Sequence, residues 1–370
     1  MESNVSLKQG VSHVIMAGGS GTRFWPVSRA GLPKQFLPLV GEQPLIRQAH
    51  DRAASMSGER SVYIAAGMAH RAMILEALPG FDPARFIAEP CARNTAPCVG
   101  LAALTLRRAD PDGVMVVAPA DHVYTDTPAL VRAIESAVEA ARAGEALVTL
   151  GIRPSRPDTG FGYVEMEETP SPGLPPGVRR ARRFVEKPDA ATAKGYVASG
   201  RFLWNSGLFV WRTRAILRAI ETCAPEVWKG LTRIDAALGG PDEQRVVREA
   251  FDTMPSISID YAVMEKAPEV LVVPADPGWS DVGSWDAVAE LHDTDAAGNG
   301  VVAPGGEVLH VNASQCFVYS TTGRFISVVG ASDLVIVDAG DALLVCRRGE
   351  SQSVRAVVDA LKARGRGELV

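Results

Sequence analysis

The sequence predicts an α/β fold, with a mixed, mostly parallel sheet followed by a small all-β unit. Two observations lead to this prediction. Through the first two-thirds of the chain, short apolar runs rich in β-branched residues alternate with segments of helical periodicity, which is typical of βαβ units. After His292 no helical periodicity interrupts a series of short β-type runs, which is typical of a coil or solenoid.

Composition limits the class of protein. An apolar content of 46% with 22% charged residues describes a globular chain with a sizeable core, and 370 residues suit one large and one small domain. The net charge of −5 provides no general attraction for nucleic acid, so any anion site must be local. No signal-peptide or membrane-spanning run is present, and five cysteines without CxxC spacing indicate a reducing cytoplasm and no structural zinc.

Four apolar runs are predicted as strands of the sheet: His13–Met16, Val62–Ala66, Val114–Ala118 and Leu147–Gly151. Helices are expected between them. The clearest covers Pro128–Arg142 with Thr127 as its N-cap, because its apolar residues recur on one face. Another is expected to run through Arg107, with Asn94 as its N-cap.

The chain is predicted to divide into a disordered tail (1–12), a large domain (13–294) and a C-terminal unit (295–370). The short runs of the last unit begin near Val308, Cys316, Ile326, Leu334 and Ala342. An amphipathic segment, Ser351–Arg364, is predicted to close the chain as a helix. Because no polar motif falls in this unit, we expect it to act as a scaffold without chemistry.

A glycine-rich stretch follows the first predicted strand: residues 15–39 read IMAGGSGTRFWPVSRAGLPKQFLPL. It contains three glycines and two basic residues: Gly18, Gly19, Gly21, Arg23 and Lys34. Such turns let backbone N–H groups approach an anion. The spacing is not that of a Walker loop, and a dinucleotide fingerprint would need a glycine where Phe24 stands. The stretch therefore predicts a polyphosphate site of another kind, the alternative being a solvated turn.

Two aspartates are candidate metal ligands. Asp121 stands at the tip of the strand that ends at Ala118, where a carboxylate can hold Mg²⁺ or simply cap a turn. Asp281 lies in a glycine-bounded loop between Trp279 and Trp285, two side chains that we expect to pack in the core. It can be the second ligand only if the fold returns it to Asp121, and the spacing does not show this.

Two apolar segments, FVEKP and LWNSGLFVW, contain polar residues at Glu186 with Lys187 and at Asn205 with Ser206. Buried polar side chains need partners. Either the backbone provides them, or the residues form a sugar clamp in which Lys187 faces a phosphate.

Eight segments occur in the order GGSGTRFWPVSR…PKQF, EPCARNTAP, PADH, FGYVE, FVEKP, WNSGLFVW, SIDYAVMEK, WSDVGSW. Together they resemble the bacterial mannose-1-phosphate guanylyltransferases (GDP-mannose pyrophosphorylases), and the resemblance runs from about residue 13 to about residue 348. The opening signature alone indicates the wider sugar-phosphate nucleotidylyltransferases. The motifs FWPVSR, PKQF, RNTAP and SDVGSW narrow the resemblance to the branch of the family that uses mannose 1-phosphate and GTP.

The resemblance implies a Rossmann-like nucleotide-diphospho-sugar transferase domain followed by a short left-handed β-helix. It implies the reaction of GTP with mannose 1-phosphate to GDP-mannose and pyrophosphate, with Mg²⁺ as cofactor, in a cytoplasmic enzyme that we expect to be a homodimer. Many relatives continue into a phosphomannose isomerase domain. Because this sequence stops at Val370, we expect no such second activity.

The resemblance also implies roles for single residues. The GTP phosphates would be held by Gly18, Gly19, Gly21, Arg23 and Lys34. The guanine would lie near Asn94 and Thr95, and Mg²⁺ would be bound by Asp121 and Asp281. The mannose would be held by Gly162, Glu186 and Asn205, and its phosphate by Lys187. Asp260 and Glu265 match the family without an assigned role, and we interpret them as structural.

Two alternatives remain. The protein can be a related hexose-1-phosphate nucleotidylyltransferase that uses another nucleoside triphosphate. It can also be a catalytically silent homologue that binds GDP-mannose and regulates a partner, although the joint presence of Arg23, Lys34, Asp121 and Asp281 argues against this.

Overall fold

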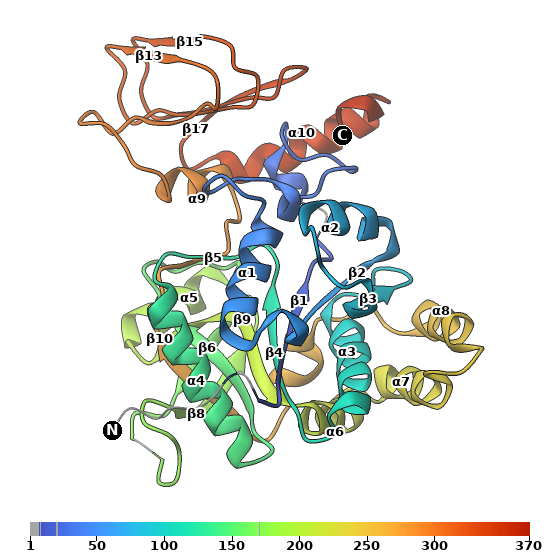
Figure 1. Ribbon diagram of the computed structural model, residues 1–370. Helices are drawn as coiled ribbons and strands as arrows, with labels where there is room; N and C mark the ends of the chain where they lie inside the picture. The colour runs from blue at the N-terminus through green and yellow to red at the C-terminus, as the bar shows by residue number, and fades with distance from the viewer. Residues whose placement is uncertain (1–6, 8, 20, 170) are drawn as a thin grey trace. The chain divides into compact units, whose positions relative to one another are not determined.

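The apolar runs that alternate with helical segments form one large sheet. The computed structural model describes residues 7, 9–19, 21–169 and 171–370, and among these nine strands pair in the order β3-β2-β1-β4-β9-β6-β10-β8-β7 (Figure 1). Their bounds are β1 Val11–Met16, β2 Val62–Gly67, β3 Phe86–Glu89, β4 Val114–Pro119, β6 Leu147–Ile152, β7 Tyr163–Met166, β8 Arg179–Val185, β9 Phe202–Arg212 and β10 Val270–Ala275.

The sheet is mixed. The strands from β3 to β4 run parallel to one another, and so do β6 and β10. The long strand β9 lies antiparallel between β4 and β6, and β7 and β8 add an antiparallel edge. The four predicted strands are all present, extended by one or two residues.

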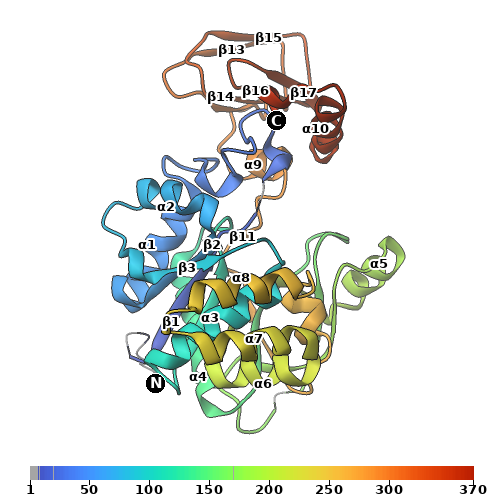
Figure 2. The ribbon, with the colours of Figure 1, turned by 90° about the vertical axis from the view of Figure 1, so that its right-hand side faces the viewer.

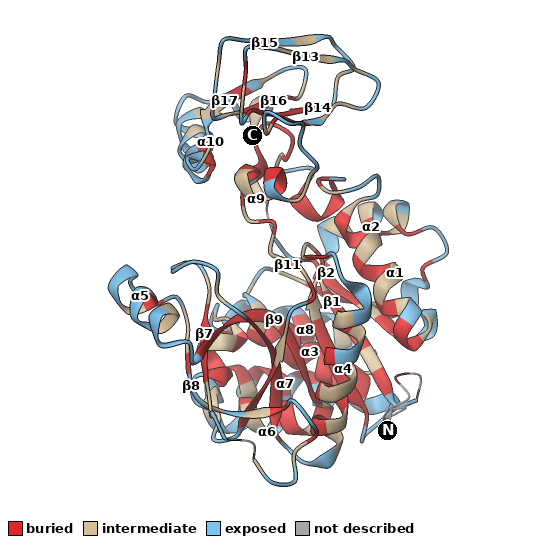
Figure 3. Ribbon diagram, turned by 90° about the vertical axis from the view of Figure 1, so that its left-hand side faces the viewer, coloured by how far each residue is buried: buried red, intermediate tan, exposed pale blue. Residues whose placement is uncertain are grey.

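Helices cover both faces of this sheet. On one face pack α3 Thr95–Ala109, α6 Thr213–Cys223, α7 Pro225–Ala237 and α8 Glu243–Thr253 (Figure 2). The other face is covered by α4 Thr127–Ala143. Alternate residues of one strand take part in the two cores: Met115 and Val117 face the first, Val114 and Val116 the second. The inner strands β4, β6 and β9 are accordingly buried over most of their length (Figure 3).

The chain forms two units by its internal contacts, and each unit is assembled from separate segments. Unit 1 comprises Met1–Gly18, Ala49–Ala120 and Tyr124–Trp279, and unit 2 comprises Gly19–Gln48, Asp121–Val123 and Ser280–Val370. Helix α1 Leu45–Ser57 has residues in both, whereas α2 Arg71–Ala77 and α5 Ala190–Ser199 belong to unit 1. The predicted domain boundary at residue 295, which would divide the chain into two continuous domains, stays a prediction. Of the predicted tail, 1–6 and 8 lie outside the described residues, and β1 already begins at Val11.

Unit 2 contains the short β runs. Strands β12 Gly300–Val302, β14 Phe317–Ser320, β16 Leu334–Asp338 and β17 Leu343–Arg347 form one sheet, and β13 Val308–Val311 with β15 Ile326–Val329 form another. Val308 pairs in parallel with Ile326, and Phe317 with Val335, each partner standing 18 residues later in the chain. This repeat is that of a β-helix-like coil, which confirms the predicted class of the C-terminal unit. The left-handed sense of this coil stays a prediction.

The coil of unit 2 shares one core with the glycine-rich stretch. That stretch forms two short 3₁₀ turns, η1 Thr22–Phe24 and η2 Lys34–Phe36. Phe24 packs in one cluster with Trp285 of α9 (Trp285–Glu290), with Phe317 of β14, and with Val354 and Val358 of α10 (Val354–Ala363). The indole N–H of Trp285 also donates to the carbonyl of Trp25, at 3.1 Å. The coil therefore covers the apolar side of the glycine-rich stretch.

Two further observations concern the bulk predictions. All five cysteines are free thiols. Among the described residues, no helix combines the length and the apolar character that a bilayer span requires.

The N-cap of α4 differs from the prediction. Asp126, one residue before Thr127, accepts a hydrogen bond from the N–H of Ala129 at 2.9 Å, and Thr127 is the first helical residue. The prediction of Thr127 was wrong because both residue types can cap, and the backbone dihedral angles decide between them. Asn94 is confirmed as the N-cap of α3.

We predict that Asp126→Ala lowers the free energy of unfolding by about 1 kcal/mol, because the Ala129 N–H loses its acceptor. Thr127→Ala is the matched control and should change it by less than about 0.5 kcal/mol. Urea unfolding of both variants decides the matter. A larger loss in Thr127→Ala would reassign the cap.

Candidate active site

Unit 2 contains a polar cavity of about 400 Å³. Two glycines, three basic residues and two carboxylates are among its lining: Gly19, Gly21, Arg23, Lys34, Arg355, Asp121 and Asp281. All of them belong to unit 2. The structure therefore brings the two predicted metal ligands to one cavity with four of the five predicted phosphate-binding residues.

Lys34 holds this arrangement together. Its side chain is only 8% exposed, and its ammonium lies 3.0 Å from Asp121 Oδ2 and donates to the backbone carbonyl of Asp281 at 2.6 Å. The ammonium also lies 5.6 Å from the ring centroid of Phe24, within range of a cation–π interaction. Lys34 thus connects three segments that are far apart in the sequence.

The two carboxylates are in different electrostatic states. Burial alone would raise the pKa of Asp121, but the charges of Lys34 and His122 hold it below its usual value, so Asp121 is ionised at neutral pH. The carboxylate of Asp281 has no hydrogen-bond or ion-pair partner among the described residues. It is half-buried on the same cavity wall, and a carboxylate in that position lacks a counter-ion.

Two glycines of the lining have close neighbours, one a backbone atom and the other a side-chain carboxylate. Gly21 has φ 62°, and a Cβ there would lie 2.4 Å from the backbone nitrogen of Lys34. A Cβ at Gly283 would lie 2.7 Å from Asp281 Oδ2. Between these last two residues, Val282 has φ 45°, which is strained for a β-branched side chain. The Asp281 loop is therefore held in an unfavourable backbone conformation.

The donor set fits Mg²⁺. Within the described ranges, no group of three or more His, Cys, Asp or Glu side chains is placed to hold a metal ion. Mg²⁺ needs only one or two carboxylates when phosphate oxygens and water complete its six ligands. Ionised Asp121 and unpartnered Asp281 provide such a pair.

Three of the predicted nucleotide residues lie outside this cavity lining, in unit 1. Gly18 follows β1, and a Cβ there would lie 3.7 Å from Glu89 Oε2. Asn94 is exposed at the start of α3 with φ 63°. The hydroxyl of Thr95 accepts a hydrogen bond from the N–H of Ile259 at 2.8 Å, so it also ties α3 to the segment that precedes Asp260.

The predicted sugar residues form a second cluster, in unit 1. A Cβ on Gly162 would lie 2.4 Å from Glu186 Oε2, so any side chain there would displace the Glu186 carboxylate. Glu186 forms an ion pair with Lys187 at 2.8 Å, and its N–H donates to Glu265 Oε1 at 2.8 Å. Asn205 Nδ2 donates to Asp260 Oδ1 at 2.8 Å. Asp260 and Glu265 thus hold two of the predicted sugar residues, a role that the sequence did not assign.

Two local details differ from the sequence analysis. Glu186 and Lys187 follow β8, which ends at Val185, and do not lie inside a strand. The reason is that Lys187 takes φ 47°, which ends the extended conformation and leaves its side chain 54% exposed. Asn205 lies inside β9 as expected, where its Oδ1 also accepts from the Thr149 hydroxyl at 2.9 Å.

Asp260 is the most perturbed carboxyl group of this cluster. Burial first, and then the charge of Glu186, raise its pKa to about 7. It stands in a π-helical turn, η6 Asp260–Met264, a type of turn that is frequent at functional sites. Near neutral pH the hydrogen-bond partner of Asn205 is therefore partly protonated.

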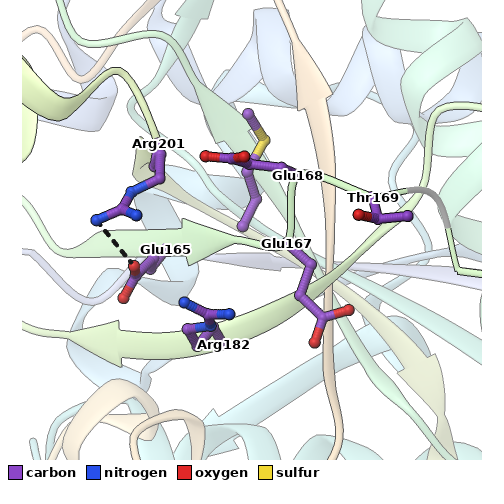
Figure 4. Close-up of a pocket in the computed structure, with 7 residues that line it drawn as sticks. Glu165, Glu167, Glu168, Thr169, Arg182 and Arg201 are labelled. Atoms are coloured by element: carbon purple, nitrogen blue, oxygen red, sulfur yellow. Dashed lines mark ion pairs between the residues drawn. The ribbon is translucent and has the colours of Figure 1, made fainter.

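A second cavity in unit 1, of about 280 Å³, is lined by Glu165, Glu167, Glu168, Arg182 and Arg201 together with Met166 and Thr169 (Figure 4). Glu165 pairs with Arg201 at 3.8 Å and with Arg183 at 3.3 Å. Its lining holds three carboxylates and two arginines, so negative charge predominates there. It has less to offer a polyanion than the cavity of unit 2.

We predict that Asp260→Asn stabilises the protein at pH 8 and not at pH 4. The folded-state pKa of Asp260 lies above its usual 3.8, so ionisation costs stability progressively as the pH rises from about 4 to about 7. The amide removes this cost, by at most about 4 kcal/mol, and can still accept from Asn205. Urea unfolding at both pH values measures the change in the free energy of unfolding, with exposed Glu221→Gln as the control. An equal effect at both pH values would contradict the assignment.

Comparison with known proteins identifies the family. Residues 12–298 match the family model "Nucleotidyl transferase", and residues 306–361 match the "MannoseP isomerase/GMP-like beta-helix domain". The chain is 41% identical to xanthan biosynthesis protein XanB of Xanthomonas campestris pv. campestris and 40% identical to mannose-1-phosphate guanylyltransferase of Escherichia coli. Each match covers 96% of this chain and 74% of the relative.

A solved structure is similar over nearly its whole length. The crystal structure of mannose-1-phosphate geranyltransferase from Thermus thermophilus superposes with a TM-score of 0.85 at 32% identity, covering 95% of this chain and 99% of that one. The matched family model spans well over half of the chain, and the relatives cover most of it. The chain therefore belongs to the nucleotidyl transferase family, in the group of the mannose-1-phosphate guanylyltransferases.

Proposed function

We propose that this enzyme converts GTP and α-D-mannose 1-phosphate into GDP-mannose and pyrophosphate. The observation that carries the proposal is the cavity of unit 2, where Lys34 joins the loops of Asp121 and Asp281 beside Arg23 and the glycine turn. Carboxylates for a metal ion together with unpaired cations suit a nucleoside triphosphate. The guanylyltransferase relatives support the choice of GTP and mannose 1-phosphate among the substrates of the wider family.

The reaction requires the enzyme to neutralise the negative charges of its substrates and does not require it to transfer a proton. An oxygen of mannose 1-phosphate attacks the α-phosphorus of GTP in line, and the bond from that phosphorus to the bridging oxygen breaks. The electron pair of that bond leaves with pyrophosphate. A phosphomonoester loses its second proton near pH 6, so the nucleophile is already an anion at neutral pH. No general base is required, and the protein has to offset the repulsion between two polyanions.

The residues of unit 2 are assigned to the triphosphate. Arg23 is exposed on the cavity and has no partner among the described residues, so its planar fork is available to phosphate oxygens. Lys34 uses two of its N–H groups on Asp121 and Asp281, and we assign the third to a phosphate. Backbone N–H groups of Gly19 and Gly21 complete the cradle. When bound by Asp121 and Asp281, Mg²⁺ neutralises charge on the phosphate oxygens.

The residues of unit 1 are assigned to the other groups of the substrates. Gly162, Glu186 and Asn205 hold the mannose: the glycine leaves room for the carboxylate, and the amide is fixed by its own partners. Lys187 takes the sugar phosphate. Burial would lower its pKa, but the contact with Glu186 raises it above the usual value, so the group stays cationic. Gly18 is assigned to the phosphates, and Asn94 and Thr95 to the guanine. We also propose a cytoplasmic homodimer.

A matrix of nucleoside triphosphates and sugar 1-phosphates, read out as pyrophosphate release, tests the proposal. We expect GTP with mannose 1-phosphate and Mg²⁺ to give the highest kcat/KM. Faster turnover of UTP or dTTP with glucose 1-phosphate would show a different member of the wider family. Binding of GDP-mannose without turnover of any pair would favour the silent homologue.

We predict that Asp281→Asn lowers kcat by about a hundredfold or more, because the metal ion loses a charged ligand. Asp281 makes its contact to Lys34 through the backbone, so the fold should be unaffected. Asp121→Asn should lose as much activity and also some stability, because it breaks the ion pair with buried Lys34. The exposed Asp359→Asn is the control. Normal turnover of Asp281→Asn at saturating Mg²⁺ would exclude this residue from the metal site.

A further inference from the structure

We infer that Arg355, on helix α10 of unit 2, is a further substrate-binding residue that holds the pyrophosphate end of the triphosphate together with Arg23. This inference rests on the proposed function and adds a residue to its site. No motif in the sequence indicates Arg355, and the C-terminal unit was expected to contain no group of the reaction.

The position of Arg355 is fixed by the core of unit 2. Helix α10 begins at Val354, whose side chain is 2% exposed, and Val358 one turn later is 3% exposed. Both pack in the cluster that contains Phe24 of η1, and α10 contacts η1 directly. Arg355 follows the first buried valine and lines the cavity. The residues that anchor α10 are therefore packed with the turn that carries Arg23.

Arg355 is a cation without a counter-charge. It is exposed on the cavity, and neither Arg355 nor Arg23 has a hydrogen-bond or ion-pair partner in the part of the chain that the structure describes. Arg29, just beyond η1, differs because it pairs with Asp341 at 2.7 Å. Two unpaired guanidinium groups on one cavity repel each other, and a polyanion bound between them removes this repulsion.

The arrangement of charges indicates which end of the triphosphate Arg355 holds. Asp121 and Asp281 would repel phosphate oxygens unless a metal ion stands between, so the carboxylate side suits the metal-bound phosphate. The two arginines have no neighbouring carboxylate that pairs with them and suit the remaining phosphates. Guanidinium forks match phosphate oxygens in bidentate geometry. Negative charge grows on the pyrophosphate as it leaves, so a fork there contributes more in the transition state than in the ground state.

The test compares Arg355→Ala and Arg355→Lys with Arg364→Ala. Arg364 follows the last turn of the same helix and is exposed outside the cavity lining. Calorimetry measures the Kd of inorganic pyrophosphate, GTP and GMP in the presence of Mg²⁺, and steady-state assays measure KM and kcat for both substrates. Thermal unfolding checks that the variants are folded.

We expect Arg355→Ala to weaken pyrophosphate and GTP about 10- to 100-fold, the loss of a charge-assisted contact, and to lower kcat. GMP binding and the KM of mannose 1-phosphate should change less than about twofold. Arg355→Lys should lie between the wild type and Arg355→Ala, because it keeps the charge and loses the fork. Arg364→Ala should behave as the wild type.

Two outcomes would overturn the inference. One is an unchanged pyrophosphate Kd in Arg355→Ala while Arg23→Ala weakens it. The other is an equal loss for pyrophosphate, GMP and mannose 1-phosphate with a lowered Tm, which would show a structural role. If the wild type formed no GDP-mannose and Arg355→Ala still lost pyrophosphate affinity, the proposed function would fall and the anion site would stand.

Discussion

The contact of Lys34 with Asp121 and with the backbone of Asp281 is the interaction on which the cavity of unit 2 depends. A buried ammonium is tolerated only if it is paired and hydrogen-bonded, and both partners come from loops distant in the sequence. Removing one partner of such a pair costs about 3–5 kcal/mol because the other charge stays buried. The groups assigned to the metal and the phosphates thus also connect the loops around the cavity, so we expect substitutions at Lys34 or Asp121 to alter activity and stability together.

Strained backbone conformations occur at or next to the predicted site residues. Outside the C-terminal coil, the described non-glycine residues with positive φ are Asn94, Lys187 and Val282. Asn94 and Lys187 are predicted site residues, and Val282 directly follows Asp281. Such conformations cost about 1–3 kcal/mol each. They persist because the surroundings hold them: Val282 is fully buried, and the side chain of Asn94 caps α3.

The sequence predicted those features of the fold that depend on residues close together in the chain. The alternation of apolar runs gave β1, β2, β4 and β6, the 8- to 10-residue spacing gave the coil, and Asn94 was recognised as a cap. It predicted Thr127 in place of Asp126 as the N-cap of α4, since the backbone angles select the cap. It did not show that Asp281 meets Asp121 through Lys34, that Asp260 holds Asn205, or that Arg355 reaches the cavity. These three features depend on contacts between segments that are distant in the sequence. In addition, the sequence pattern around Arg355 does not differ from that of an ordinary solvent-exposed face of an amphipathic helix.

The coil of unit 2 is consequently more than an attached scaffold. Its residues pack in one cluster with Phe24 and Trp285, so the turn that carries Arg23 shares its apolar core with the coil. Burial of two aromatic side chains and two valines contributes several kcal/mol to that turn, more than any single phosphate contact can contribute. A change in the packing between the coil and η1 can therefore shift polyphosphate affinity without touching a residue of the glycine-rich stretch. The shape of the proposed anion site is thus determined by apolar contacts, and its charges are determined by the loops that those contacts hold.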